Sequence, residues 1–71
     1  MKNKVKLFDV VALKQELPEK DLLPGQVSTV VEVLVPDVFE VEFTDNDGRA
    51  YAELALRVEQ LLVLHFEPSF A

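Results

Sequence analysis

The sequence predicts a small all-β barrel of five strands, with one short 3₁₀ turn before the last strand. Two observations lead to this fold class. The apolar runs are short and rich in Val, and none reaches the roughly 10–12 residues of an average helix. Turn-forming pairs separate these runs, namely Pro24-Gly25, Pro36-Asp37 and Asp47-Gly48. Because 71 residues suffice for one core only, we expect residues 1–71 to form a single domain.

The N-terminal third is predicted to hold an arm, a strand and a loop. Residues 1–6 form a basic arm, in which lysines alternate with other residues. The apolar run that follows predicts a first strand near residues 8–13. Residues 14–25 form a loop, because Pro18 and Pro24 cannot donate to a strand ladder. Three leucines of this loop are expected to fold back over one end of the core: Leu17, Leu22 and Leu23.

The rest of the chain is predicted to form two hairpins and a final strand. Pro36 fixes φ in the first hairpin turn, and Gly48 tolerates the positive φ of the second. The continuous apolar sequence of the last strand indicates burial on both of its faces. The expected elements are a strand at 26–34, a turn at 35–37, a strand at 38–43, a turn at 44–49, a strand at 49–56, the 3₁₀ turn at 58–60 and a strand at 61–64.

The strand register follows from the alternation of apolar and polar residues. If Leu34 lies opposite Val38, and Thr44 opposite Arg49, a single face of the sheet becomes entirely apolar. That face carries Val31, Val33, Phe39, Val41, Phe43, Ala50, Ala52 and Leu54. We expect five of these residues to be buried together in the core: Val31, Phe39, Val41, Phe43 and Leu54.

The opposite face of the predicted sheet is acidic. This register places Glu32, Glu40 and Glu53 in one lateral row, with Glu42 beside Tyr51. Like charges directly opposite each other destabilise a sheet by a fraction of a kcal/mol per pair, so the row needs an explanation. One interpretation is a solvated face whose glutamates prevent edge-to-edge aggregation. The other is an acidic surface that binds a basic partner.

The charge distribution favours a cationic partner over a nucleic acid. Residues 7–71 carry four basic side chains against 13 acidic ones, and such a surface repels phosphate backbones. No apolar run approaches the roughly 18 residues needed to cross a bilayer. The apolar segment behind the basic arm is also too short for a signal peptide. We therefore expect a cytoplasmic protein that does not bind membranes.

The sequence offers no recognisable catalytic, cofactor or metal site. The chain lacks cysteine and has only one histidine, His65, without an obvious partner. Asp45-Asn46-Asp47-Gly48 resembles part of a calcium loop, but the EF-hand spacing would place Phe43 and Leu54 at ligand positions. This segment is therefore predicted to be a hairpin turn. We expect no enzymatic activity and no cofactor.

The C-terminal tail, residues 66–71, carries two aromatic side chains. Phe66 and Phe70 lie beyond the last predicted strand. Two interpretations remain open. The rings cap the bottom of the barrel, or they dock on another chain, since aromatic residues are enriched at protein interfaces.

The order of the elements resembles an SH3-like barrel, and residues 25–33 resemble the KOW-type signature of ribosomal and transcription-factor barrels. Ser28 stands where those domains usually have glycine, and their basic RNA-binding residues are absent. Residues 7–64 are similar to an uncharacterised family of small bacterial domains. The matching segments include Phe8–Leu13, Glu40–Phe43, Asp47–Arg49 and Gln60–Leu62. Some members of that family resemble the small partner in two-gene modules of toxin–antitoxin type.

These observations predict a non-catalytic protein-interaction module. Its partner would be a basic protein, for which the product of a neighbouring gene is a candidate. The residues expected to carry binding are Glu32, Glu40, Glu42, Tyr51, Glu53, Phe66 and Phe70. One alternative is a nucleic-acid-binding barrel that uses Lys2, Lys4 and Lys6, and another is an accessory subunit of an enzyme complex. We expect a monomer or a weak homodimer.

Overall fold

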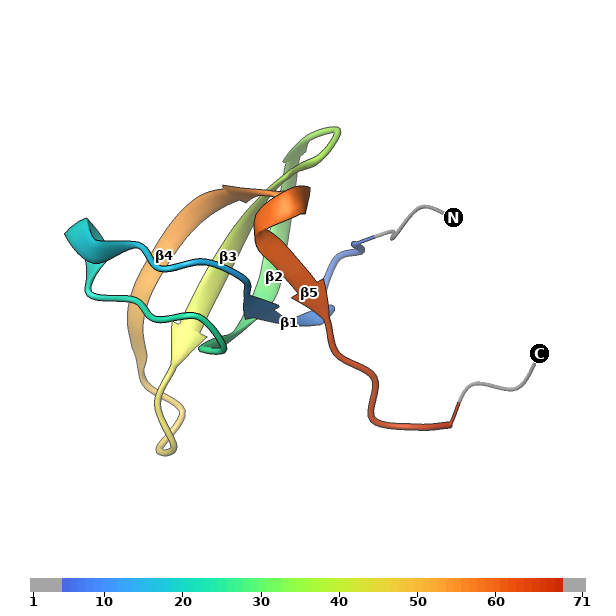
Figure 1. The fold of residues 1–71 in the computed structure, drawn as a ribbon. Helices are drawn as coiled ribbons and strands as arrows, with labels where there is room; N and C mark the ends of the chain where they lie inside the picture. The colour runs from blue at the N-terminus through green and yellow to red at the C-terminus, as the bar shows by residue number, and fades with distance from the viewer. Residues whose placement is uncertain (1–4, 69–71) are drawn as a thin grey trace.

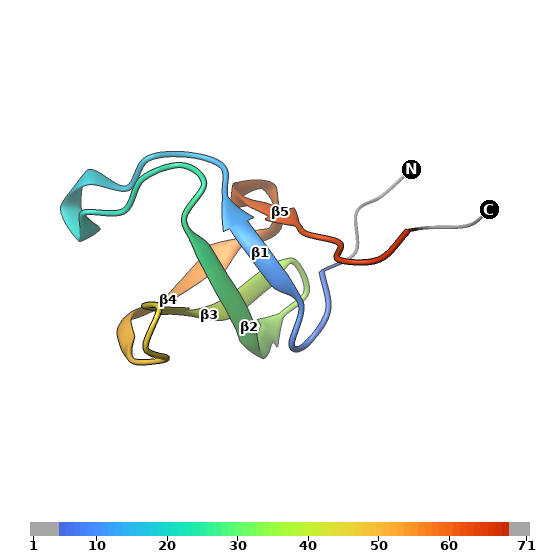
Figure 2. The same cartoon turned by 90° about the horizontal axis from the view of Figure 1, so that it is seen from below.

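A computed structural model describes residues 5–68 of the chain. Its five antiparallel strands form one sheet in the order β4-β3-β2-β1-β5. Figure 1 shows that this sheet is strongly curved, and in the view from below (Figure 2) β3 and β4 cross behind β1 and β2. This arrangement confirms the predicted class, a small five-stranded SH3-like barrel. The strands are β1 (Val10–Leu13), β2 (Val27–Val35), β3 (Val38–Thr44), β4 (Ala50–Arg57) and β5 (Leu61–Val63), and the 3₁₀ turn η2 (Val58–Gln60) precedes β5.

The first strand begins two residues later than predicted. Phe8 adopts a left-handed φ of 71°, which extended strands do not allow. A turn holds it there, because the Asp9 amide donates to the Lys6 carbonyl at 3.0 Å and the Asp9 carboxylate accepts from the Lys6 amide at 2.8 Å. The Phe8 amide still donates to the Val30 carbonyl at 2.8 Å. The basic arm is thus joined to the barrel by a turn rather than by a continuous strand.

The loop between β1 and β2 contains a short 3₁₀ helix, η1 (Pro18–Lys20), that was not predicted. The loop is pinched where the backbones of Leu17 and Leu22 exchange hydrogen bonds of 2.9 and 3.2 Å. Leu22 is buried and Leu17 packs against the core, as expected. Leu23 is 58% exposed, so the prediction for that leucine was wrong. At this pinch, the Leu22 side chain lies toward the core and the neighbouring Leu23 side chain lies toward solvent.

The predicted register of the second hairpin was wrong by two residues. Phe43 pairs with Ala52, not with Ala50. One residue of the difference arises in the loop, where the Asp45 amide donates a hydrogen bond of 2.9 Å to the Arg49 carbonyl, so that Thr44 pairs with Ala50 instead of Arg49. The other is a bulge at Tyr51. Because side chains alternate with a period of two, the two-residue shift leaves β4 from Ala52 onward on its predicted faces. Ala50 is shifted by one residue only; it pairs with Thr44 and is exposed, so its predicted place on the apolar face was wrong.

The first hairpin contains an irregularity with the opposite consequence. Glu32 pairs with Glu40 as predicted, but beyond Val31 the register changes by one residue, and Val30 pairs with Val41. A one-residue change exchanges the two faces of a strand. Val30 is therefore fully buried, whereas Val31, which was predicted to lie in the core, is only half-buried.

The core lies inside the curl and draws on all five strands and the first loop. Phe39, Val41 and Phe43 are buried, as predicted, while Leu54 packs against the core from its margin. Leu62 is 47% exposed, because the single sheet packs on a core with its inner face only; the expected burial of the last strand on both faces was wrong. The buried hydrophobic cluster comprises Val11, Leu13, Leu22, Val30, Phe39, Val41, Phe43, Leu56 and Leu61.

Candidate functional site

Four glutamates share the outward face of the central strands, and we call this surface the acidic face. Glu40 and Glu42 stand on β3, two residues apart. Glu32 of β2 lies directly opposite Glu40, and Glu53 of β4 lies directly opposite Glu42. The β3 glutamates are half-buried, and the two on the flanking strands are exposed. The fold therefore brings together all four predicted glutamates, as two opposed pairs.

The arrangement within the acidic face differs from the predicted lateral row. Ala55, not Glu53, is the direct neighbour of Glu40 on β4, so Glu53 lies diagonal to Glu40. A diagonal neighbour in a sheet remains within reach of a long side chain. The two-residue shift of β4 thus keeps Glu53 in the cluster and gives Glu42 a charged neighbour as well. The result is a compact group of carboxylates instead of a line of three.

The effect of this crowding is concentrated on Glu40. Desolvation, followed by the proximity of the Glu53 carboxyl and the charge of Glu32, raises the pKa of Glu40 above its usual value. A raised pKa means that the folded protein resists the ionised form of this side chain. The acidic face is therefore under mutual repulsion at neutral pH.

In residues 5–68, no salt bridge joins a glutamate of the acidic face to a lysine or an arginine. Both arginines pair with other carboxylates, Arg49 with Asp45 and Asp47, and Arg57 with Glu59 at 2.9 Å. These pairs lie in the second hairpin loop and at the start of η2, away from the middle of the sheet. The described part of the acidic face consequently offers its negative charge to external groups.

We predict that Glu40→Gln stabilises the protein at neutral pH by a few tenths of a kcal/mol, because it removes the carboxylate under most repulsion. The raised pKa of Glu40 fixes the pH dependence. Protonation favours the folded state, so the stability deficit of the wild type disappears as the pH falls through and below the usual glutamate range near 4.5. Urea unfolding of both proteins at pH 7 and pH 3.5 measures this difference.

Glu59→Gln is the matched control for this prediction. The hydrogen bond from Arg57 lowers the pKa of Glu59, so its ionised form favours the folded state above the usual glutamate pKa. Removing that charge should not stabilise the protein at pH 7. An equal stabilisation by both substitutions would show that total charge, and not the crowding at Glu40, governs the effect.

Tyr51 does not lie beside Glu42, as the predicted register required. It is the extra residue of the β4 bulge, and its ring lies 6.1 Å from that of Phe43, centroid to centroid. The Tyr51 hydroxyl accepts a hydrogen bond of 2.8 Å from the side-chain amide of Gln26. Tyr51 thus connects the start of β2 to β4 across one end of the barrel. This role is structural, although half of the side chain remains exposed.

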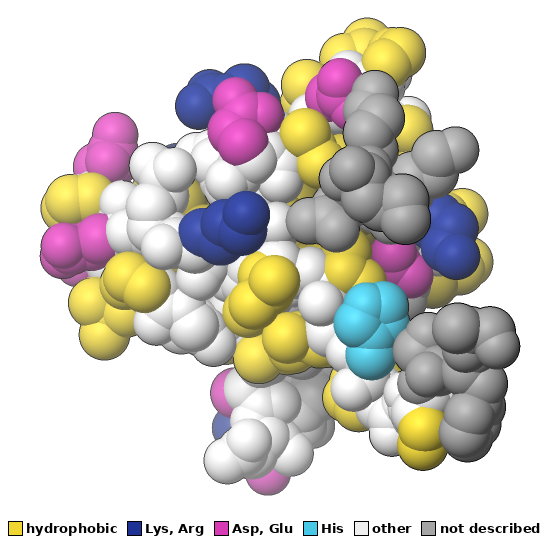
Figure 3. Space-filling model, turned by 45° about the vertical axis from the view of Figure 1, so that its right-hand side comes forward, with side chains coloured by type: hydrophobic (Ala, Val, Ile, Leu, Met, Phe, Trp, Pro, Cys, Tyr) yellow, Lys and Arg dark blue, Asp and Glu magenta, His cyan; other side chains and the backbone are white. Residues whose placement is uncertain are grey.

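The tip of the β2–β3 hairpin is an exposed apolar surface that sequence reasoning missed. Figure 3 shows hydrophobic side chains gathered at the top of the molecule, where this tip lies. Val33 was predicted on the apolar face and pairs with Phe39 as predicted, but its side chain is half exposed at this end of the hairpin. The exposed residues there are Val33, Leu34 and Val35, at 48%, 41% and 55%.

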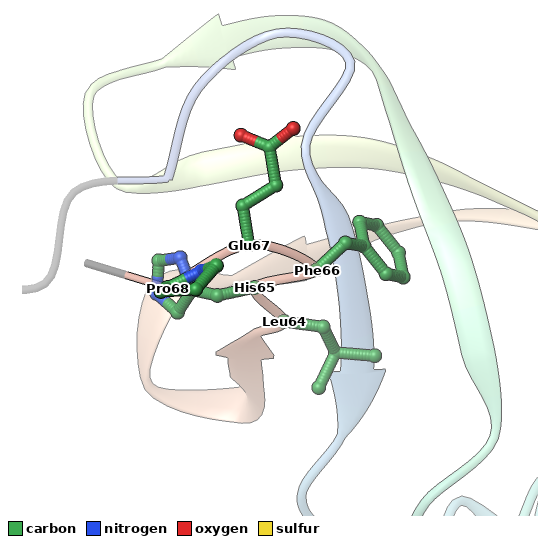
Figure 4. A pocket seen from close by; sticks show the side chains of 5 residues that line it. All are labelled: Leu64, His65, Phe66, Glu67 and Pro68. Atoms are coloured by element: carbon green, nitrogen blue, oxygen red, sulfur yellow. The ribbon is translucent and has the colours of Figure 1, made fainter.

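The segment after β5 encloses a shallow hollow of about 430 Å³, which is lined by Leu64, His65, Phe66, Glu67 and Pro68. Figure 4 shows Leu64 and Phe66 pointing to one side, and His65 and Pro68 to the other. Five consecutive residues of one bent segment do not form a cleft between elements. Phe66 is 79% exposed, so it does not cap the barrel. Phe70 lies outside the described residues.

The described residues hold few groups suited to metal or nucleophilic chemistry. Within residues 5–68, no group of three or more His, Asp or Glu side chains, the acidic face included, is arranged so that it could hold a metal ion. The second hairpin turn uses its own potential ligand internally, because the Asp45 carboxylate accepts from the amides of Asp47 and Arg49 at 2.9 and 3.0 Å. His65 is exposed at the surface (Figure 3). None of the helices among these residues has the length and apolarity to cross a membrane.

Sequence comparison places the chain in a family. Residues 7–63 match the family described as "Domain of unknown function (DUF4926)", and this protein belongs to that family. The matched range runs from just before β1 to the last residue of β5, so it contains the whole barrel. No curated protein and no solved structure matches the chain.

Proposed function

We propose that this DUF4926 domain is a non-catalytic, cytoplasmic protein-interaction module that binds a basic protein through its acidic face. The observation that carries the proposal is the presence of two pairs of directly opposed carboxylates, Glu32 with Glu40 and Glu42 with Glu53. A solvated face needs charge, but it does not need like charges placed opposite each other. Bound lysines or arginines would relieve the repulsion that the free protein bears.

The partner is proposed to be the product of a neighbouring gene, with this chain as the small, antitoxin-like member of the pair. The charge balance of residues 7–71 supports a cationic partner, because a surface of one sign accelerates association with the opposite sign. Phe66 would add an apolar contact at the rim, since it is exposed in the segment that follows β5.

A titration of the purified neighbouring gene product against wild type and Glu40→Gln tests this proposal. We expect the substitution to weaken the complex several-fold at low salt, chiefly through a slower association rate. The loss should shrink as the salt concentration rises, because ions screen charges at a surface.

Glu19→Gln is the matched control, since it removes the same charge from an exposed residue of η1. This variant should bind almost as tightly as the wild type. If Glu40→Gln and Glu19→Gln bind with the affinity of the wild type at low salt, the acidic face has no part in binding. If both weaken the complex equally, net charge and not the acidic face is responsible.

A further inference from the structure

The outermost long strand of the sheet has an unused edge. β4 pairs with β3 on one side, and in the described chain no ladder joins its other side to another strand (Figure 1). The barrel is therefore open between β4 and β5. A strand edge of this kind presents unpaired N–H and C=O groups, which a further strand can use.

The direction of two amides shows which residues face the open edge. The Val58 amide donates to the Asp37 carbonyl at 2.9 Å, toward the β3 side, whereas the Arg57 amide donates to the Gln60 side chain at 2.8 Å. Successive amides of a strand alternate in direction, and the β3–β4 register is regular from Arg57 to Ala52. The backbone groups of Ala55 and Glu53 consequently point away from β3.

The unpaired part of the β4 edge is limited at both of its ends. At one end, the Arg57 backbone amide already donates a hydrogen bond to the Gln60 side chain. At the other, the bulge at Tyr51 interrupts the regular strand. Between them, Glu53 and Ala55 are exposed, while Ala52 and Leu54 on the inner face are half-buried. The stretch has room for a short added strand, and its inner face would gain cover from apolar side chains of that strand.

We propose that the β4 edge accepts an antiparallel strand from the partner in which lysine or arginine alternates with apolar residues. This inference rests on the proposed function and specifies how the basic partner is held. Residues opposite Glu53 and Ala55 would project onto the acidic face. Neighbouring strands lie about 4.8 Å apart, and Ala55 ends at its Cβ, so a lysine opposite it can reach across toward Glu40.

Charge decides between this occupant and a second copy of the chain. Antiparallel pairing of two β4 edges through Glu53 and Ala55 would place the two Glu53 side chains opposite or diagonal on one face. Each copy would thereby add a like charge to an already crowded group. A basic strand instead supplies the opposite charge at those positions.

Three capped hexapeptides of alternating Lys and Val test the proposal, with NMR of the wild-type protein as the readout. In antiparallel pairing, the lysine opposite Glu53 points its own amide toward β4, and the valines point theirs away. The second peptide carries N-methyl groups on its lysines and the third on its valines, so all three carry the same charge. We expect the first and third to shift the Glu53 and Ala55 amides with affinities within about twofold, and the second to bind at least tenfold more weakly.

Equal affinity of the two methylated peptides would overturn the edge proposal and leave the acidic face as the binding surface. Absence of binding by all three, beside tight and Glu40-dependent binding of the neighbouring gene product, would also overturn it. A concentration-dependent dimer that shifts the same amides without peptide would assign the edge to a second copy. Edge-dependent peptide binding together with a partner complex insensitive to Glu40→Gln would instead refute the proposed function alone.

Discussion

Phe43→Ala is expected to unfold most of the protein at 37 °C. Phe43 is fully buried near the C-terminal end of β3 and packs beside the Tyr51 ring. Truncating a buried aromatic side chain costs about 3–5 kcal/mol, because apolar contact is lost and a cavity remains. A domain of this size has only about 5 kcal/mol of stability in total. Thermal unfolding followed by circular dichroism measures the effect.

Phe66→Ala is the matched control, since it makes the same substitution at a ring that is 79% exposed. Its melting temperature should stay close to that of the wild type, because an exposed ring loses little contact. A Phe43→Ala variant with an unchanged melting temperature would contradict the position of Phe43 in the core and, with it, the face assignment of β3.

Leu22→Ala is expected to cost about 2–5 kcal/mol, although the residue lies in a loop. Leu22 is 1% exposed and belongs to the core cluster. The hydrogen bonds between the Leu17 and Leu22 backbones hold it there, so the loop cannot rearrange to fill the cavity. Urea unfolding gives the change in free energy directly.

Leu23→Ala offers an unusually close comparison, because it is the same substitution one residue further along. Leu23 is 58% exposed, and its loss should change stability by no more than about 0.5 kcal/mol. Similar losses for the two variants would show that the first loop does not pack as the structure has it. A large loss for Leu23→Ala alone would reverse the assignment of the two leucines.

The candidate site shows which parts of a surface can be read from sequence. The alternation of Glu40 and Glu42 with buried residues placed both on one face, and the tight turn at Pro36-Asp37 brought Glu32 opposite Glu40. Glu53 remained on this face even though its predicted register was wrong by two residues. Tyr51 does not lie on this face as predicted, because it is the extra residue of the β4 bulge. The position of that bulge depends on how the loop before β4 closes, and it leaves no periodic signal in the sequence.

The sequence by itself determined the fold class, the order of the strands along the chain and the 3₁₀ turn at Val58–Gln60, because short apolar runs and turn residues are local signals. Only the tertiary structure decided that Val30 and not Val31 is buried, that Leu22 and not Leu23 faces the core, and that β4 keeps an open edge. In each adjacent pair the two residues are chemically alike, so pattern alone cannot rank them. A one-residue bulge, a backbone pinch and the closure of the sheet make these choices, and each depends on contacts between segments far apart in the chain.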